Sequence, residues 1–304
     1  MLAEAVEGLH IRQDGLYVDC TFGRGGHSQA ILERLGEGGR LLAIDRDKDA
    51  VCSPEANALS RDFRFQIQQG RYAELITLVE QLGWRGRVAG ILMDLGVSSP
   101  QLDVAERGFS FLRDGPLDMR MDRDRGIAAA EWLRLVSEQE LGQVLRDFGE
   151  ERYARRIARA IVAHRARQPI GTTKQLASVI AAAIPRWERG KHPATRSFQA
   201  IRILVNRELQ ELEDGLSQTI DSMMIGGRLA VIAFHSLEDR LVKRFMRDES
   251  RGVVGEDCWP GRALHGRKPR LKRIGGPRKP SIGEVQANPR ARSAILRIAE
   301  KLPP

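Results

Sequence analysis

Residues 17–45, which read YVDCTFGRGGHSQAILERLGEGGRLLAID, constrain the fold more than any other part of the chain. The segment opens with a short apolar strand, turns at a glycine-rich loop over 23–26, and continues with the apolar spacing of a helix. A second apolar strand follows at 41–44 and ends in Asp45. Glycines permit positive φ or a close backbone approach. Because the order is strand, helix, strand, the segment predicts a parallel βαβ unit.

The position of Asp45 predicts a cofactor that carries a ribose. This acid follows Gly23 by 22 positions, close to the offset of about 20 at which a carboxylate meets the ribose of a bound nucleotide. A dinucleotide fingerprint would need a third glycine where Ser28 stands, and Asp19 before the loop would repel a pyrophosphate. A cationic sulfonium tolerates that acid. The segment therefore favours S-adenosylmethionine over NAD, and the alternative is an ordinary βα turn without a ligand.

The remaining strands and helices predict an α/β protein with a mostly parallel sheet and a helical insertion. Over 130 residues separate Asp94 from Arg228, far more than the dozen or so that one crossover requires. Further strands are predicted at 64–67, 88–93 and 228–234, with a helix at 72–82. Inserted helices are predicted at 131–148, 153–164, 174–184 and 194–216, the last returning the chain to the sheet. We therefore predict a sheet domain in two parts, 1–103 and 209–304, around an inserted domain at 104–208.

The charge distribution predicts a polyanionic partner. The chain has a net charge of +9, and residues 262–279 contain eight basic side chains and no acid. Pro269, Gly275, Gly276 and Pro277 keep most of that run out of helix. Arg152–Arg159 forms a second basic cluster at helical spacing. Nucleic acid is the favoured partner of the 262–279 loop, and the alternative for both clusters is a solvated surface.

Composition also excludes several classes of protein. The longest apolar runs, about six residues, fall far short of the 18 or so that span a bilayer, and no signal peptide is visible. Cys20, Cys52 and Cys258 are scattered and include no C-x-x-C pair, so neither a disulfide framework nor a zinc site is predicted. We expect a cytoplasmic protein that needs no metal.

Polar residues follow the predicted strands at 88–93 and 228–234. Asp94 ends the first, and His235-Ser236 follows the second. A hydrolase is disfavoured, because no G-x-S-x-G surrounds Ser236. Ser236 and Asp239 instead fit the S-x-x-[DE] capping box of a helix. That cap leaves His235 and Glu238 without a structural explanation, and both are candidate site residues.

Segments along nearly the whole chain resemble the bacterial ribosomal RNA small-subunit methyltransferase H family, also called MraW. The matching segments include YVDCTFGRGGHSQAIL, AIDRD, ILMDLGVSSPQLD, GPLDMRMD, HPATRSFQAIRILVNRELQELE, VIAFHSLEDRLVK and NPRARSAILRIAEK. The resemblance implies a class I, Rossmann-like methyltransferase fold with an inserted all-helical domain. It implies S-adenosylmethionine-dependent methylation of the N4 amine of one 16S rRNA cytidine in the decoding region, at the P site of the small ribosomal subunit.

The resemblance also implies which residues form the site. Carried over by position, the cofactor contacts are Gly25, Gly26, His27, Asp45, Tyr72, Asp94 and Gln101. From its place at the end of the predicted strand 88–93, and not from the resemblance, Asp94 is the candidate acceptor for a proton of the substrate amine, although its role can be cofactor binding alone. The candidate RNA contacts are Arg196, Phe198, His235, Glu238, Lys268, Arg270, Lys272 and Arg273.

The residue that stacks on the target base, the class of activity and the oligomeric state remain open at this stage. Phe109, Phe111 and Phe198 are candidates for stacking on the target base, and the alternative for each is a place in the core. No cysteine is suited to carbon-5 methylation. The alternatives to the methyltransferase are an RNA-binding assembly factor that retains a cofactor pocket and, less favoured, an NAD-dependent oxidoreductase. A homodimer is compatible with the sequence, which does not fix the oligomeric state.

Overall fold

A computed structural model describes residues 1–187, 190, 192–252 and 268–304. Cys258 and the basic residues Arg262 and Arg267 therefore lie outside the described residues, together with the part of the predicted basic loop that precedes Lys268. The chain divides into two compact units. The sheet unit comprises residues 1–96 and 209–304, and the helical unit comprises residues 97–208.

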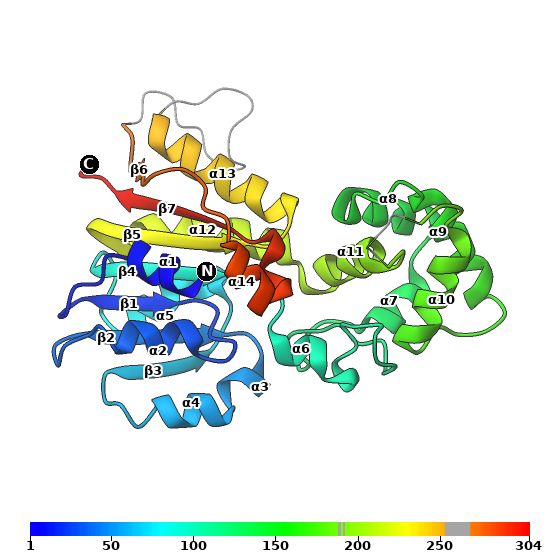
Figure 1. The fold of residues 1–304 in the computed structure, drawn as a ribbon, viewed down its shortest axis with the longest axis horizontal. Coiled ribbons are helices and arrows are strands. Elements are labelled where there is room, and N and C mark those ends of the chain that lie inside the picture. The colour runs from blue at the N-terminus through cyan, green and yellow to red at the C-terminus, as the bar shows by residue number, and fades with distance from the viewer. Residues whose placement is uncertain (188–189, 191, 253–267) are drawn as a thin grey trace. The chain divides into compact units, whose positions relative to one another are not determined.

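The sheet unit is built on seven strands in the order β3-β2-β1-β4-β5-β7-β6 (Figure 1). The strands are β1 (Leu16–Asp19), β2 (Arg40–Asp45), β3 (Phe65–Gln69), β4 (Val88–Asp94), β5 (Met223–Ala233), β6 (Leu271–Arg273) and β7 (Ile295–Lys301). Strands β1 to β5 pair in parallel, and β7 pairs antiparallel with β5 and β6. The prediction of a mostly parallel α/β sheet is confirmed. The parallel strands place the carboxyl ends of β1, β2 and β4 side by side at one edge.

Strands β6 and β7 were not predicted from the sequence. Strand β7 has mixed burial, since Leu296 and Ile298 face the core while Arg297 and Glu300 bind other side chains. Its pairing partner β5 ends more than 60 residues earlier in the chain. Strand β6 lies between Pro269 and Gly275, so the expectation that the run is not helical is confirmed for its described part, residues 268–279.

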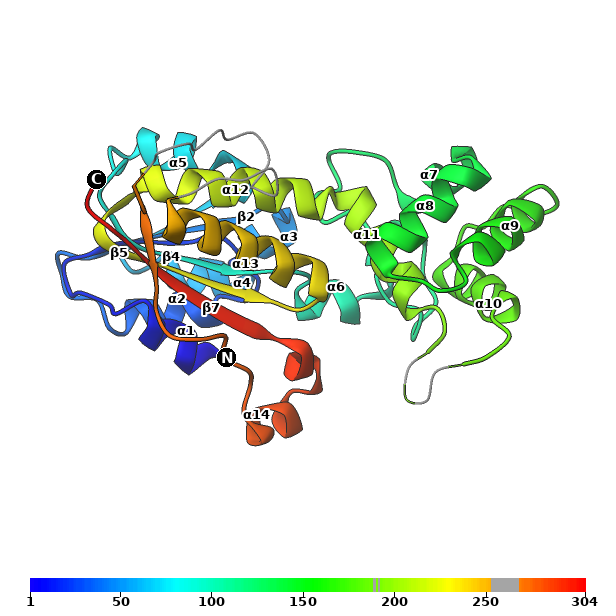
Figure 2. The same ribbon diagram turned by 90° about the horizontal axis from the view of Figure 1, so that it is seen from above.

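Helices cover both faces of this sheet (Figure 2). They are α1 (Leu2–Gly8), α2 (Gly26–Leu32), α3 (Lys48–Val51), α4 (Pro54–Leu59), η1 (Tyr72–Glu74), α5 (Leu75–Gln81), α12 (Glu208–Ser222), α13 (Ser236–Arg251), α14 (Ile282–Ala287) and η3 (Pro289–Ser293). Helices α1, α2 and α4 pack in one core layer. Helices α5, α12 and α13 pack in the other, with Leu75, Leu216 and Phe245 fully buried. Two covered faces explain why the inner strands are apolar runs without alternation.

The helical unit contains six α-helices and one short 3₁₀ turn within the described residues. They are α6 (Ser99–Asp103), η2 (Ala105–Arg107), α7 (Ala129–Leu135), α8 (Glu138–Gly149), α9 (Ala154–Arg165), α10 (Thr173–Ala183) and α11 (Thr195–Asn206). The predicted helix 131–148 is interrupted, because the Ser137 side chain caps a new helix by accepting from the backbone N–H of Glu140 at 3.1 Å. The predicted helix 194–216 is interrupted at Arg207, which has a φ of +51°. A left-handed residue ends a helix, so α11 ends before Arg207 and α12 is a separate helix. No helix among the described residues is long and apolar enough to cross a membrane.

Candidate active site

The loop after β1 has the backbone geometry that its glycines predict. Gly23 has a φ of +54° and Gly25 a φ of +73°. A Cβ atom at Gly25 would lie 2.8 Å from the ring of Phe22, closer than atoms pack. Gly25 therefore satisfies two constraints at once: it adopts a left-handed conformation, and its missing side chain leaves room for the Phe22 ring. It is the N-cap of α2, whose first residues are Gly26 and His27.

The 22-residue offset between the loop and Asp45 corresponds to a direct contact. Oδ2 of Asp45 accepts from the backbone N–H of Gly23 at 2.8 Å, and Oδ1 accepts from the N–H of Asp47 at 2.8 Å. Burial raises the pKa of Asp45 to about 6, against the lowering effect of these two hydrogen bonds. The carboxylate is thus fixed against the glycine loop, and each oxygen retains a lone pair for a ligand hydroxyl.

Asp19, whose charge before the loop predicts that a pyrophosphate is disfavoured, has an internal role. Its side chain is fully buried. Oδ2 accepts from the Ser28 hydroxyl at 2.7 Å, and Oδ1 accepts from the backbone N–H of Thr21 at 3.1 Å. Burial is the main reason that the pKa of Asp19 is raised. Ser28, which stands where a dinucleotide fingerprint has glycine, therefore anchors α2 to the end of β1.

Asp94 and His27 form a pair at the carboxyl end of β4. Nδ1 of His27 lies 3.5 Å from Oδ2 of Asp94, whose side chain is 30% exposed. The backbone N–H of Asp94 donates to the Thr21 hydroxyl at 2.7 Å, which connects β4 to the loop after β1. Burial raises the pKa of Asp94 to about 6, although His27 opposes that shift. Burial also lowers the pKa of His27, so the neutral imidazole is favoured at neutral pH.

Two polar atoms of this pair lack hydrogen-bond partners among the described residues. Oδ1 of Asp94 and Nε2 of His27 are both buried and unpartnered. A buried polar group without a partner is costly, and such atoms are typical of a site completed by a ligand. The pair is therefore suited to accept a hydrogen bond from an amine.

Tyr72 and Gln101, the two other predicted contacts, lie in different units. Tyr72 begins η1, directly after β3, so it follows the strand next to β2 and Asp45. Gln101 belongs to the helical unit, where its Oε1 accepts from the backbone N–H of Ser98 at 3.0 Å and caps α6. The sheet unit thus brings together the glycine loop, Asp45, Tyr72, His27 and Asp94 at neighbouring strand ends.

The predicted capping box after β5 is wrong in its residues. Nδ1 of His235 accepts from the backbone N–H of Glu238 at 3.4 Å, and Oε2 of Glu238 accepts from the N–H groups of Phe234 and His235. The N-cap is therefore His235, with Glu238 as its reciprocal partner, whereas Asp239 binds Arg297 at 2.7 Å. Capping supplies the structural explanation that these two residues lacked.

Substitutions of His235 distinguish a role as the N-cap of α13 from a role in contacting the substrate. His235→Ala should lower the free energy of unfolding by about 0.5–2 kcal/mol, and His235→Asn, which keeps an N-cap acceptor, should recover most of that loss. Thermal unfolding measures both variants. If His235→Asn is as stable as the wild type yet fails to methylate RNA, His235 has a substrate role beyond its cap.

The polar side chains of α11 are largely occupied within the helical unit. Asn206 is buried, where its Oδ1 accepts from the N–H of Met121 at 2.8 Å, and Arg202 binds Glu208 at 2.8 Å.

Phe198 and Phe109 belong to the core of this unit. This removes both from the candidates for base stacking. Phe111 is partly buried, with its ring 4.4 Å from that of His192. Arg196, another predicted RNA contact, is partly buried.

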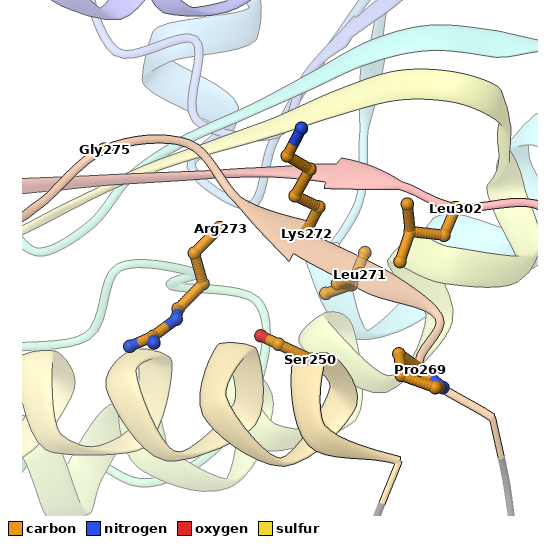
Figure 3. A pocket seen from close by; sticks show the side chains of 7 residues that line it. All are labelled: Ser250, Pro269, Leu271, Lys272, Arg273, Gly275 and Leu302. Atoms are coloured by element: carbon orange, nitrogen blue, oxygen red, sulfur yellow. The ribbon is translucent and has the colours of Figure 1, made fainter.

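The predicted basic contacts near β6 differ in their surroundings. Arg270 is not a surface cation, because its Nε donates to the buried Glu249 at 2.7 Å. Lys268, Lys272 and Arg273 are exposed. Lys272 and Arg273 extend in opposite directions from β6, beside an open hollow of about 650 Å³ that is also lined by Ser250, Pro269, Leu271, Gly275 and Leu302 (Figure 3). The two cations therefore cannot converge on a single phosphate.

The strand order, with one antiparallel strand next to a parallel sheet and a cofactor-type loop after β1, defines a class I methyltransferase fold. The predicted Rossmann-like fold is confirmed. A family model described as the MraW methylase family matches residues 1–302. The chain belongs to this family.

Two curated relatives resemble the chain over almost its full length. One is the ribosomal RNA small subunit methyltransferase H of Methylococcus capsulatus, 61% identical over 302 residues, which are 99% of both chains. The other is the protein of the same name from Nitrosococcus oceani, 55% identical over 301 residues. That match covers 99% of this chain and 95% of the Nitrosococcus protein. Membership of the predicted family is confirmed.

Proposed function

We propose that the protein transfers a methyl group from S-adenosylmethionine to the N4 amine of a 16S rRNA cytidine in the decoding region of the small ribosomal subunit, in the cytoplasm. The observation that carries the proposal is the His27–Asp94 pair, with its two unpartnered buried atoms, at the strand end beside the glycine loop. The names of the two relatives support rRNA as the substrate. The cytidine and its N4 position rest on the family resemblance.

The residues present fit this cofactor. Asp45 would accept from the ribose hydroxyls, Tyr72 would contact the adenine, and Gly25 and Gly26 would leave room for the chain of the cofactor. Oδ1 of Asp94 would satisfy its missing hydrogen bond with an ammonium or amine N–H. The bound cofactor supplies an electrophilic methyl group on a sulfonium. Asp94, at the strand end beside the glycine loop, suits a cation better than a pyrophosphate, which disfavours NAD.

The chain's own contribution to catalysis is to hold and deprotonate the amine. The N4 lone pair of cytosine is delocalised into the ring, so the amine is a weak nucleophile. A carboxylate that accepts an N–H of the amine favours the pyramidal form and can take the proton. Asp94 suits this role because its pKa of about 6 lies near neutral pH, where a general base is most effective. Holding the amine in line adds a proximity contribution.

Calorimetric titration separates the proposal from its alternatives. Heat of binding with S-adenosylmethionine and none with NAD is expected. Binding to NAD alone would replace the proposal with an oxidoreductase. Cofactor binding without methylation of 30S subunits that lack the modification would favour an assembly factor.

The exposed cations at β6 are expected to bind RNA phosphates. A variant with Lys268, Lys272 and Arg273 changed to Ala should bind 30S subunits less tightly, and the slope of log affinity against log salt should fall by about 1 for each phosphate that the variant no longer binds. Arg270 is kept, because its removal would leave Glu249 buried without a partner. Filter binding over a salt series measures the slope.

A matched control removes the same charge beside strands β2, β3 and β4, none of which is a neighbour of β6 in the sheet. Arg34, Arg61 and Arg87 are exposed and precede β2, β3 and β4, so they lie toward the amino ends of those strands. Changing these three to Ala should leave the slope close to that of the wild type. If both triple variants give the same slope, the β6 cations are ordinary surface charges.

A further inference from the structure

One face of α12 contacts the turn that carries Tyr72. Glu211, Gly215 and Gln218 are four and three residues apart, so they share a face of the helix. Each of them meets the segment 71–76, which joins β3 to α5. Leu212 and Leu216 of the same helix pack with Leu75 of α5 in one core layer. The helix and the turn are thus in contact over about two helical turns.

Polar contacts hold the two ends of this turn. Oε1 of Glu211 accepts from NH1 of Arg71 at 3.0 Å, and Glu211 is buried. Oε1 of Gln218 accepts from the backbone N–H of Ile76 at 2.8 Å, and its amide nitrogen donates to the carbonyl of Ala73. Buried polar contacts are costly to break, so α12 fixes the backbone on both sides of Tyr72.

Between these contacts, Gly215 lets the helix approach Tyr72 itself. A Cβ atom at position 215 would lie 2.9 Å from Cδ2 of the Tyr72 ring and 3.1 Å from its carbonyl oxygen. The glycine is in the middle of α12, not at its end as the sequence suggested. Glycine is an unfavourable residue in a helix interior. Its presence here is explained by the space that Tyr72 occupies.

We propose that the Glu211–Gly215–Gln218 face of α12 is a positioning surface that sets the place of Tyr72 and thereby the affinity for the adenine end of the cofactor. The inference rests on the proposed S-adenosylmethionine function. Gly215 acts through Tyr72 and is a positioning residue. The segment that α12 contacts is short, since η1 comprises only three residues.

The test is Gly215→Ala, with Gly142→Ala as its matched control. A Cβ at Gly142, in the middle of α8, would meet its nearest atom at an ordinary 3.7 Å. The Gly215 variant should weaken S-adenosylmethionine binding at least tenfold in calorimetry. The Gly142 variant should bind within twofold of the wild type and unfold at a higher temperature. If the Gly215 variant is folded and binds as the wild type does, the inference is wrong.

Two further measurements show whether Gly215 acts through Tyr72. 5′-Methylthioadenosine, which has the adenine and ribose but no amino acid, should lose affinity by the same factor as the full cofactor. In a Tyr72→Ala background, Gly215→Ala should change the affinity by a smaller factor than in the wild type, since the crowded ring is gone and only the backbone carbonyl of residue 72 remains close. An undiminished effect in that background would overturn the inference.

Glu211→Gln tests the same face by another contact if Gly215→Ala does not fold. It keeps the size of the side chain but removes the charge that pairs with Arg71, so a several-fold loss of affinity for 5′-methylthioadenosine is expected. Unchanged affinity would contradict the inference. A wild-type protein that binds no S-adenosylmethionine would refute the proposed function as well, whereas normal binding by wild type and variants alike refutes only the inference.

Discussion

Replacing Asp94 by Asn is expected to slow methyl transfer at least 100-fold. Asn matches the shape of Asp but cannot take a proton, and loss of a general base costs about 10²–10⁴ in rate. Single-turnover methylation of 30S subunits at saturating cofactor measures the chemical step, and calorimetry measures cofactor affinity separately. Wild-type rates in the Asn variant would show that Asp94 is neither the amine acceptor nor a needed cofactor contact.

The pH dependence of the reaction gives an independent check. Because the ionised carboxylate is the acceptor and its pKa is about 6, kcat/KM should fall about tenfold per pH unit below 6 and level off above it. The Asn variant should lack this acidic limb. An unchanged limb in the variant would assign it to another group, such as Asp45, whose pKa is also about 6.

Asp94→Asn should also stabilise the ligand-free protein against unfolding. The folded pKa of Asp94 is above its ordinary value of 3.8, so ionising this half-buried group opposes folding, and the penalty is present above pH 6 and absent below pH 4. Asp94→Asn should therefore raise the free energy of unfolding at pH 7 by about 1–3 kcal/mol. The difference from the wild type should disappear near pH 4. A lower stability at pH 7 would contradict this account of the site.

Local patterns predicted the glycine loop and the acids that follow the strands of the sheet unit, because each of them is adjacent in sequence to an apolar strand. The 22-residue offset from Gly23 to Asp45 corresponds to a hydrogen bond between them. Asp94 follows directly from the end of an apolar strand. The role of Asp19 was less accessible, since its partner Ser28 lies in the first turn of α2, where the sequence alone showed only a missing glycine.

Contacts between distant residues account for most of what the sequence did not predict. Strand β7 forms by pairing with β5, which lies far from it in the sequence. The ion pair of Arg270 is with Glu249, which is 21 positions earlier in the chain. The left-handed Arg207 is at a position where residue type gave no signal, because arginine rarely adopts that conformation. His235 is an unusual N-cap, so the pattern favoured the commoner Ser236. A Glu three residues after His235 was the available signal.

Asp45→Ala is expected to weaken S-adenosylmethionine binding by about 1–3 kcal/mol, or roughly 5- to 150-fold. The change removes the acceptors of the ribose hydroxyls and also leaves the N–H of Gly23 without its partner. Calorimetric titration of the two proteins measures the loss. Unchanged affinity would remove Asp45 from the cofactor site.

A neighbouring acid provides the control for this substitution. Asp47 caps α3 by accepting from the N–H of Asp49 at 3.0 Å, and Asp47→Ser removes the same charge while keeping a capping oxygen. Its cofactor affinity should stay within about threefold of the wild type, less than the 1 kcal/mol or so that a broken hydrogen bond costs. A cofactor analogue that lacks the ribose 2′-hydroxyl completes the test. Wild type should discriminate against this analogue, whereas Asp45→Ala should bind it and S-adenosylmethionine about equally, because the group that recognises the hydroxyl is gone.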